Sequence, residues 1–365
     1  MQILGIANSY ASAPVNEPTS LSAVQSTTSV AISFTAPTND GGTAITNYEY
    51  SFNNSTWTAL SPADAASPVT VSGLTANSAY TVYLRAINIV GSGPASSGVS
   101  FTTNPIFTSA TGGTTNTYTE SGVVYKSHTF TGSSSFTISE LGSYPTVDYV
   151  IVGGAGGGGA GSGGGGGGAG GMRVISGAAI TAGTYAITVG GGGGQTGSGT
   201  GSSIAGISSV SGGGYGAVGS GNPAYGAAGG SGGGGGSEYG GADTPRPGGA
   251  GTSGEGNNGG HAGPNSGIGY RSGGGGGGKS GVGGGGDGGY GGGGGGAGLA
   301  STFSTGASAT YAIGGAGGQS GRNSGSQARH GVAYGEGGDG AHGAFNVFTA
   351  GNGAGGIVII RYRFG

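Results

Sequence analysis

Short runs in which apolar and polar residues alternate occupy residues 17–103. Three clear examples are residues 30–34, 48–52 and 80–86, and turns rich in Pro, Asn and Gly separate them. Alternation with a period of two is typical of strands that bury one face. Turns at this spacing are typical of an antiparallel sandwich of about seven strands. The pattern therefore predicts an all-β unit over this segment.

A second group of runs follows from Ile106, where Thr, Ser and aromatic residues alternate. Residues 123–131 and 135–139 flank a Gly-Ser-Ser turn, so they predict a β-hairpin. Residues 172–175 and 183–189 predict two more strands.

Two apolar runs enclose most of the glycine. Residues 147–152 lead directly into the first glycine run, and residues 355–362 form a continuous apolar strand near the end of the chain. A continuous run of this length is typical of a strand buried on both faces. Pairing the two runs would fasten both ends of the glycine-rich part to one sheet.

Glycine dominates the chain after Val150. It supplies 102 of 365 residues, in runs such as 163–168 and 291–296. Glycine loses more conformational freedom on ordering than other residues, so an ordered run needs a special arrangement. Packed polyproline-II-type helices provide one, because they have three residues per turn and make all their hydrogen bonds to neighbouring helices. We therefore expect a folded body of polyglycine-II helices.

Charge and cysteine content exclude several classes of protein. Charged residues are 6% of the chain, the net charge is −3 and there is no cysteine. No run of Lys and Arg could follow a phosphate backbone, so no nucleic-acid partner is expected. We expect neither a disulfide framework nor a metal site, and no cofactor. The N-terminus lacks the pattern of a signal peptide, and no apolar run is long enough for membrane insertion.

Two known glycine-rich patterns do not apply to this part of the chain. Residues 273–280 fit the phosphate-binding loop literally, but that loop needs a strand before it and a helix after it, whereas Gly281 begins another glycine-rich stretch. A collagen triple helix needs glycine at every third position and much proline, and the chain has only 12 prolines. Neither nucleotide binding nor a triple helix is predicted.

One acidic cluster is the best candidate for chemistry. Glu336, Asp339 and His342 are spaced three apart. On a helix of three residues per turn, neighbours in this set lie about 9 Å apart, too far to share one metal ion. We therefore interpret them as solvent-facing edge residues and predict no catalytic residue and no enzyme. Glycan cleavage by carboxylates that meet in space is the enzymatic alternative.

Polar and aromatic residues interrupt the glycine runs at several points. Such clusters are either plain turns or recognition loops, since Tyr, Asn, Arg and His give large contact area and adaptable hydrogen bonding. The candidate receptor-binding residues are Tyr225, Tyr239, Arg246, Asn258, His261, Asn265, Tyr270, Arg271, Arg329, His330, Phe345 and Phe348.

The order of residues in the first β unit resembles that of a fibronectin type III domain. Leu74 and Tyr80 have the spacing of a tyrosine corner, in which a phenol hydroxyl bonds to the backbone. Phe34 departs from the family, many members of which carry Trp there. The other matching positions are Pro18, Leu21, 34–42, Ile45, Tyr48, Gly73, 85–88 and 91–94.

The later strands resemble a second family. The stretches 125–131, 147–154, 183–190 and 355–362 are similar to the glycine-rich domain common in tail-fibre and other virion proteins of aquatic bacteriophages. The glycine-rich part is also similar in architecture to the polyglycine-II sandwich of tip adhesins from T-even-like phages. In those adhesins, non-glycine loops at one end contact the host.

These observations predict an all-β chain: a fibronectin type III sandwich followed by a β-scaffolded glycine-rich domain with polyglycine-II helices. The expected parts are an attachment segment (1–16), a fibronectin type III-like domain (17–104), a β-strand region (105–152) and a glycine-rich domain (153–365) closed by a C-terminal strand (356–363).

The resemblances imply a phage virion structural protein, either a tail fibre or a tip adhesin that contacts the host surface. Its expected partners are other virion proteins, through the N-terminal segment and the fibronectin-like domain, and a host-surface glycan or outer-membrane protein. It would be made in the host cytoplasm and reside on the tail or capsid surface. A slender fibre predicts a homotrimer, and a self-closed bundle predicts a monomer.

One alternative is also a structural virion protein: a phage head-decoration or capsid fibre protein without receptor duty. Two alternatives belong to other classes: a cellular surface adhesin, and an ice-binding protein built from polyglycine helices.

Overall fold

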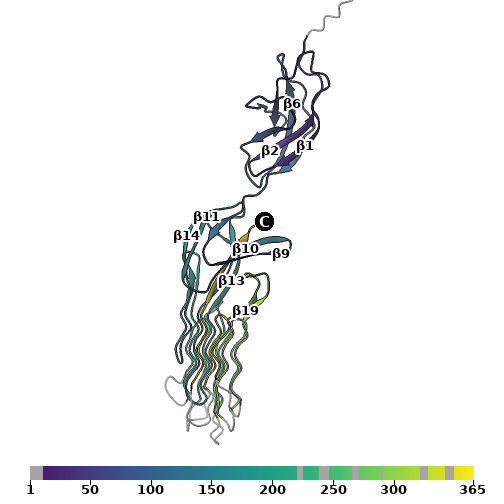
Figure 1. Cartoon of the computed structure of the whole chain (residues 1–365). Coiled ribbons are helices and arrows are strands. Elements are labelled where there is room, and N and C mark those ends of the chain that lie inside the picture. The colour runs from purple at the N-terminus through teal and green to yellow at the C-terminus, as the bar shows by residue number, and fades with distance from the viewer. Residues whose placement is uncertain are drawn as a thin grey trace, which may run out of the picture. The chain divides into compact units, whose positions relative to one another are not determined.

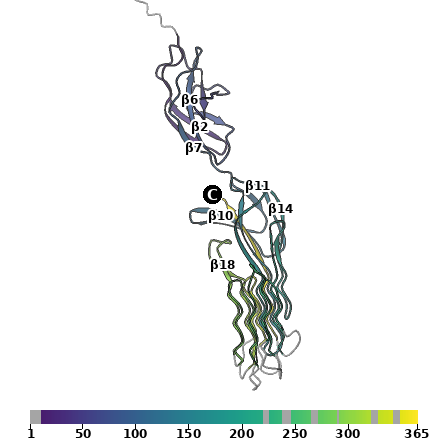
Figure 2. The same cartoon turned by 180° about the vertical axis from the view of Figure 1, so that it is seen from behind.

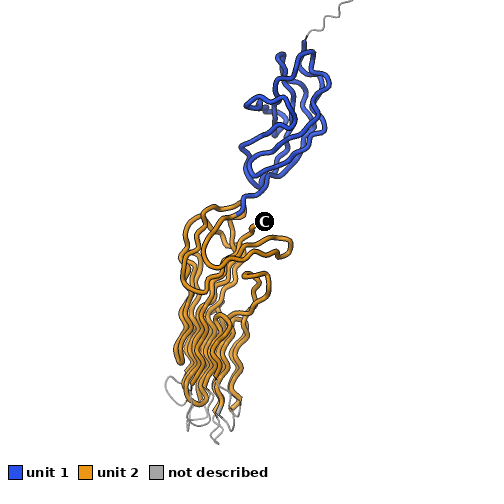
Figure 3. The backbone as a smooth tube through the Cα atoms, in the orientation of Figure 1, with its two compact units in different colours: residues 1–107 blue, residues 108–365 orange. Residues whose placement is uncertain are grey.

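The computed structural model divides the chain into two compact units, residues 1–107 and 108–365 (Figure 3). Its secondary structure consists of strands, with no helix among the residues that the structure describes, so the predicted all-β class is confirmed. The described residues are 11–219, 225–237, 246–264, 271–288, 291–320, 328–341 and 349–365.

The first unit is a sandwich of two antiparallel sheets. One sheet has the order β1-β2-β5, with β1 (Thr19–Gln25), β2 (Ser29–Thr35) and β5 (Val69–Ser72). The other has the order β4-β3-β6-β7, with β4 (Thr58–Ala59), β3 (Asn47–Ser51), β6 (Ala79–Ile87) and β7 (Val99–Thr102). The predicted sandwich over residues 17–103 is confirmed.

Alternating side chains fill the core of this sandwich. Val30 and Ile32 of β2 meet Tyr48 of β3 and Leu84 of β6, and all four are fully buried. Burial of every second residue is what the period-two pattern predicts for a sheet with one face in the core.

The family-specific positions also lie as expected. Phe34 packs edge-to-face on Tyr48, with ring centroids 4.5 Å apart, so this departure from the expected Trp is accommodated in the core. The Thr75 backbone N–H donates to the Tyr80 hydroxyl at 3.0 Å, which confirms the predicted tyrosine corner.

The second unit begins with two packed five-stranded sheets. One has the order β13-β12-β21-β10-β9, with β13 (Met172–Ala179), β12 (Thr146–Val152), β21 (Ile357–Arg363), β10 (Val123–Phe130) and β9 (Thr114–Glu120). The other has the order β16-β15-β14-β11-β8, with β16 (Ser208–Val210), β15 (Ser202–Ile204), β14 (Gly183–Thr188), β11 (Ser134–Glu140) and β8 (Ser109–Thr111). Apolar side chains from both sheets form one shared core.

The predicted hairpin of residues 123–131 and 135–139 is wrong. Strand β10 pairs with β9 and β21, whereas β11 pairs with β8 and β14 in the other sheet. The short turn between them crosses from sheet to sheet, so that Phe130 and Phe136 face each other in the core, 6.3 Å apart. Burying these two rings together outweighs local pairing of the two strands.

The predicted closure of the chain is confirmed. Strands β12 and β21 pair antiparallel, from Asp148 opposite Arg361 to Val152 opposite Ile357. The strands predicted at 172–175 and 183–189 are β13 and β14. Both ends of the glycine-rich part are therefore attached to neighbouring strands of one sheet.

Extended segments run side by side away from the two sheets (Figures 1 and 2). We call this part the glycine bundle; its segments are 153–160, 164–171, 190–194, 197–201, 211–219, 225–230, 231–237, 246–251, 256–263, 271–278, 282–287, 291–297, 312–319, 328–333, 336–341 and 349–356.

Hydrogen bonds in the glycine bundle repeat every third residue. The N–H groups of residues 153, 156 and 159 donate to segment 164–171, whereas those of 154 and 157 donate to 197–201, and those of 155 and 158 to 349–356. Successive residues thus bond in three directions. The bundle satisfies its backbone through neighbours that are distant in sequence.

Segment 164–171 is surrounded on all sides. It donates to three neighbours and accepts from three others. A Cβ added at Gly167 would overlap the carbonyl group of Gly156, so a side chain has no room there. The donating contacts go to 211–217, 274–277 and 335–338, and the accepting contacts come from 153–159, 231–237 and 315–318.

Two short strand pairs complete the fold: β17 (Arg271–Ser272) with β20 (Gln319–Ser320), and β18 (Leu299–Ser301) with β19 (Ala309–Tyr311). The loop between β18 and β19 folds back on the first five-stranded sheet, where Phe303 is buried and Ser304 O accepts from Ser127 Oγ at 2.6 Å.

Candidate functional site

The predicted receptor-binding residues fall into two groups. Tyr239, Asn265, Tyr270, Phe345 and Phe348 lie outside the described residues. The structure places the others in or beside segments of the glycine bundle: Tyr225, Arg246, Asn258, His261, Arg271, Arg329 and His330.

Arg271 lies at the end of the glycine bundle that is far from the two sheets. A Cβ added at Gly163, in the turn between segments 153–160 and 164–171, would meet the Cβ of Arg271. Arg246 bonds to the neighbouring segment through its carbonyl, which accepts from Ala262 N–H at 2.9 Å. The backbone and Cβ positions of Arg271 and Arg246 are thus fixed by neighbouring segments of the glycine bundle.

Asn258 lies at the opposite end, near the sheets. Its Oδ1 accepts from Gly251 N–H at 2.9 Å, and the adjoining turn bonds to β13 through Met172 N–H and Glu255 O at 2.9 Å. Asn258 therefore has the local role of a turn residue. The structure does not bring it together with Arg271.

Asp339 and Arg329 form an ion pair at 3.2 Å. Asp339 is only 6% exposed, and its carboxylate also accepts from the N–H groups of Ala316 at 2.9 Å and Arg329 at 3.3 Å. The prediction that Asp339 faces solvent is therefore wrong, because its carboxylate replaces a missing carbonyl acceptor inside the bundle. The Arg329 side chain is 73% exposed and is held in place by this pair.

The neighbours of Asp339 act locally. Glu336 is half-buried and accepts from the N–H groups of Val332 at 2.8 Å and Ala333 at 2.7 Å. His330 accepts from Asn352 N–H through Nδ1 at 2.9 Å, and His342 lies outside the described residues. The carboxylates of this cluster are occupied by backbone groups, which leaves them poorly placed for acid–base chemistry.

Glu255 is a buried carboxylate that the sequence analysis missed. It accepts from Ser211 N–H at 2.8 Å and pairs with Arg173 at 3.2 Å. Beside it, the Lys279 ammonium donates to Gly254 O at 2.6 Å, and burial lowers the pKa of Lys279. Glu255 fastens the glycine bundle to β13. In the sequence, the only sign of this role is a single acidic residue within a glycine-rich stretch.

Arg361 is a second buried charged residue that the sequence analysis missed. Its guanidinium bonds to Asp148 at 2.9 Å and Tyr118 at 3.0 Å, and it lies over the rings of Tyr125 and Phe303. Burial alone lowers the pKa of Arg361, but hydrogen bonds from the charged form to its partners raise the pKa above its ordinary value. Arg361 therefore stays charged and clamps strands β9, β12 and β21 together.

His128 is a fully buried polar residue of β10. Its Nδ1 lies 2.6 Å from Gly112 O, and its Nε2 lies 3.2 Å from the Tyr362 hydroxyl. Burial lowers the pKa of His128 and raises the pKa of Tyr362 to about 12. Both side chains are therefore neutral near pH 7.

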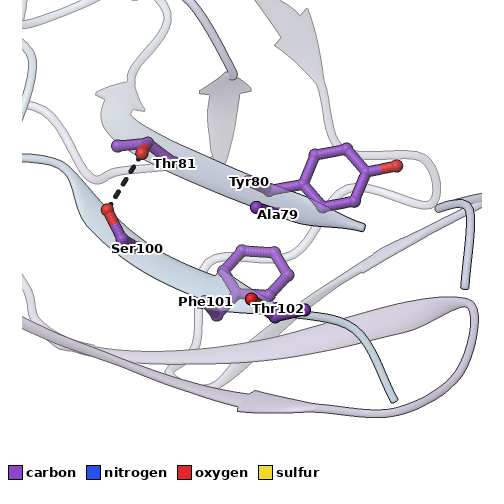
Figure 4. Close-up of a pocket in the computed structure, with 6 residues that line it drawn as sticks. All are labelled: Ala79, Tyr80, Thr81, Ser100, Phe101 and Thr102. Carbon is purple, nitrogen blue, oxygen red and sulfur yellow. Dashed lines mark hydrogen bonds between the residues drawn. The ribbon is translucent and has the colours of Figure 1, made fainter. Parts of the chain in front are cut away.

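A small hollow on the first unit lies between the ends of β6 and β7 (Figure 4). Its volume is about 380 Å³. Tyr80 stacks on Phe101 at 5.7 Å, and Thr81 bonds to Ser100 at 2.9 Å. Its residues are Ala79, Tyr80, Thr81, Ser100, Phe101 and Thr102, none of which is charged.

Three further features bear on the sequence predictions: the phosphate-loop match, possible metal ligands and possible membrane-spanning helices. Residues 279–288, at and after the end of the phosphate-loop match, are bends and irregular backbone, so the match lacks its helix. Among the described residues, no three His, Cys, Asp or Glu are placed to hold a metal ion. The described part of the chain also has no helix long and apolar enough to cross a membrane.

Comparison with known proteins supports the architecture of the first unit. Residues 16–102 match the model of the fibronectin type III domain. Such domains are in general non-catalytic structural or adhesive modules. No curated protein sequence matches the chain.

Two solved structures from titin are similar over 26% of this chain at 26% identity, each with a TM-score of 0.22. One contains domains from titin and is matched over 32% of its length; the other is titin kinase with its flanking domains, matched over 18%. The chain thus matches about a third or less of the length of the chains in these two structures.

Proposed function

We propose that the chain is a non-enzymatic bacteriophage virion protein, a tail fibre or tip adhesin that contacts the host surface. The observation that carries the proposal is the three-residue hydrogen-bond repeat of the glycine bundle. It is the repeat of packed polyglycine-II helices. It supports the resemblance to glycine-rich phage fibre domains that the strand sequences suggest.

A bundle of this kind suits a rigid support for loops. Its segments bond through the backbone in three directions, so stiffness does not depend on a large apolar core. Both of its ends are fixed by the β12–β21 pair. Connections between segments are then free to vary in sequence, as binding loops on a rigid scaffold do.

Described side chains near the connections are suited to polar ligands. Arg329 is exposed but is held by Asp339, so little of its rotamer freedom remains to be lost on binding. Tyr225 is 61% exposed and offers a ring face and a hydroxyl. Arg and Tyr are frequent anchors in recognition surfaces, and a host glycan or outer-membrane protein is the partner that we propose.

The fibronectin type III unit would serve as a spacer, and the N-terminal segment would join other virion proteins. The proposed location is the virion tail, reached after synthesis in the host cytoplasm. A head-decoration protein without receptor duty is the rival that the test must separate.

The test combines location and competition. Antibody against residues 17–103 should label the tail end of source particles in immunogold electron microscopy, and purified protein should inhibit particle adsorption to host cells. Arg329→Ala and Tyr225→Ala should weaken inhibition, whereas the control Val282→Ala should not. Label over the head would favour decoration, and absence of label would contradict a virion role.

A further inference from the structure

The four-stranded sheet of the first unit has an inner face in the core and an outer face with a different set of side chains. Tyr48 of β3 and Leu84 of β6 point into the core. Successive residues of a strand point to opposite faces, so Glu49, Tyr83 and Arg85 lie on the outer face. Glu49 stands directly opposite Arg85 in the pairing of β3 with β6.

The single tryptophan of the chain also lies on this outer face. The Arg85 guanidinium stacks over the Trp57 ring, 4.4 Å from its centroid. Trp57 is half-buried, and the core of the sandwich contains Phe34 but no tryptophan. Trp, Tyr and Arg are the residues that most often anchor a binding partner. A tryptophan that the core does not use therefore indicates a binding role for this face.

The side chains of the outer face are held in place before any ligand binds. The Glu49 carboxylate pairs with Arg85 and also accepts from the Ser92 hydroxyl at 2.9 Å. A Cβ added at Gly98 would lie 2.8 Å from the Tyr83 ring, so glycine at this position leaves room for the ring. Side chains that are already ordered lose little rotamer freedom on binding.

The hollow between β6 and β7 continues this face (Figure 4). Thr81 and Ser100 stand opposite each other on the two strands, and their hydroxyls bond at 2.9 Å. The Cβ added at Gly98 would also lie 2.8 Å from Thr81 Cγ2, so the Tyr83 ring lies beside Thr81 at the border of the hollow. The volume of about 380 Å³ falls within the range of about 300–1,000 Å³ for small-molecule pockets.

The chemistry of the face and the hollow favours an uncharged polar ligand. None of the six residues that line the hollow is charged, and Glu49 and Arg85 neutralise each other on the adjoining face. Two hydroxyls that bond to each other use one proton, so a second proton and several lone pairs remain for a ligand. Trp and Tyr rings supply apolar contact together with a polar group. A sugar ring matches this combination, because it presents both C–H groups and hydroxyls.

We propose that the outer face of this sheet is a carbohydrate-binding site that takes a neutral oligosaccharide. One sugar ring would lie against Trp57, Arg85 and Tyr83, and another would enter the hollow beside Thr81 and Ser100. Thr81 and Arg85 are four positions apart on β6, which is about 13 Å at the rise of a strand, so the site is longer than one sugar ring. The site lies in the first unit alone, and the proposal does not depend on a virion role for the chain.

Tryptophan fluorescence of the full chain tests the proposal, because Trp57 is the only tryptophan and lies at the site. The neutral probes are cellohexaose, maltohexaose and the hexamer of N-acetylglucosamine, and hexagalacturonate is their acidic counterpart. We expect at least one neutral probe to change the Trp57 emission saturably and to bind more tightly than hexagalacturonate. The absence of a saturable change with every neutral probe would overturn the proposal, as would tighter binding of the acidic one.

Ser100→Lys and Ser72→Lys are a matched pair of variants. Both serines are exposed in short strands, but Ser72 belongs to β5 in the other sheet. Ser100→Lys should weaken binding of the responding probe at least about tenfold, a loss of about 1.4 kcal/mol, because the lysine side chain occupies the hollow. Ser72→Lys should bind that probe as the wild type does. Equal affinities of the two lysine variants would contradict the site.

Tyr83→Ala is the second variant and decides the matter if Ser100→Lys does not fold. It removes the ring that borders the hollow and leaves Trp57 as the reporter. Its affinity for the responding probe should fall by a similar factor, and an unchanged affinity would overturn the proposal.

Discussion

Within the glycine bundle, contacts with adjacent segments, rather than the local backbone conformation, decide where glycine is required. At Gly167, a Cβ would overlap the backbone of Gly156, which cannot move without breaking its own hydrogen bonds. At Gly294, the same Cβ would meet nothing. The identity of a residue in the bundle is thus set by how completely it is surrounded.

Gly167→Ala should lower the free energy of unfolding by about 1–3 kcal/mol, the typical cost of overpacking a tight interior. Gly294→Ala should be neutral or stabilise by up to about 1 kcal/mol, since it restricts the unfolded chain. Chemical denaturation of both variants and the wild type measures the difference. Equal effects at the two positions would contradict the packing argument.

His128 should make the stability of the second unit depend on pH. Burial holds its folded pKa below the ordinary 6.5, so the unfolded state binds the proton more readily. The stabilisation is complete above pH 6.5 and is lost as the pH falls from there through the folded pKa. His128→Gln should remove this component of the pH dependence in unfolding curves between pH 8 and 5.

A titration of His128 by NMR provides an independent check if that variant does not fold. A midpoint at or above 6.5 in the folded protein would refute the expectation.

Elements of the second unit are tied together by side chains from distant parts of the chain. Glu255 joins a bundle turn to β13 and to the residue after β16, through Arg173 and Ser211. Its carboxylate is buried, whereas the Arg173 side chain is 43% exposed. Removing Glu255 and removing Arg173 should therefore lower the free energy of unfolding by different amounts.

Glu255→Ala leaves a buried N–H without its acceptor and should cost about 1–3 kcal/mol of unfolding free energy. Arg173→Ala removes a partly exposed ion pair and should cost about 1 kcal/mol or less. Thermal unfolding of both variants tests this order, and a larger effect at Arg173 would show that the ion pair dominates.

The elements differ in how far the sequence predicts them. The sandwich and the β12–β21 pair follow from apolar periodicity, because each strand carries its own burial pattern. The hairpin prediction failed because alternation alone does not tell which sheet a strand joins, and Phe130 and Phe136 meet across two sheets. Arg361 could not be found, since Tyr118 lies far from it in sequence and meets it only through the fold.

At the scale of the whole molecule, the last strand completes the second unit. Strand β21 lies in the middle of its sheet, between β12 and β10, and Ile359 and Ile360 are fully buried. The sheet that supports the glycine bundle therefore cannot be complete without β21.

Truncation before residue 357 should abolish cooperative unfolding of the second unit, because it removes the central strand and leaves β10 and β12 unpaired with each other. The first unit should keep its own transition, since its core is separate. Calorimetry of the truncated and full chains distinguishes these outcomes. Preserved amide protection in β12 after truncation would show that the strand is dispensable.

The three-residue hydrogen-bond repeat limits how such a chain can change length during evolution. Adding three residues to a segment returns each N–H group to the same direction, so the segment grows by one layer and keeps its neighbours. Adding one or two residues redirects every later N–H group in that segment. Insertions and deletions within segments are therefore tolerated in multiples of three, whereas the connections between segments can lengthen freely and diversify.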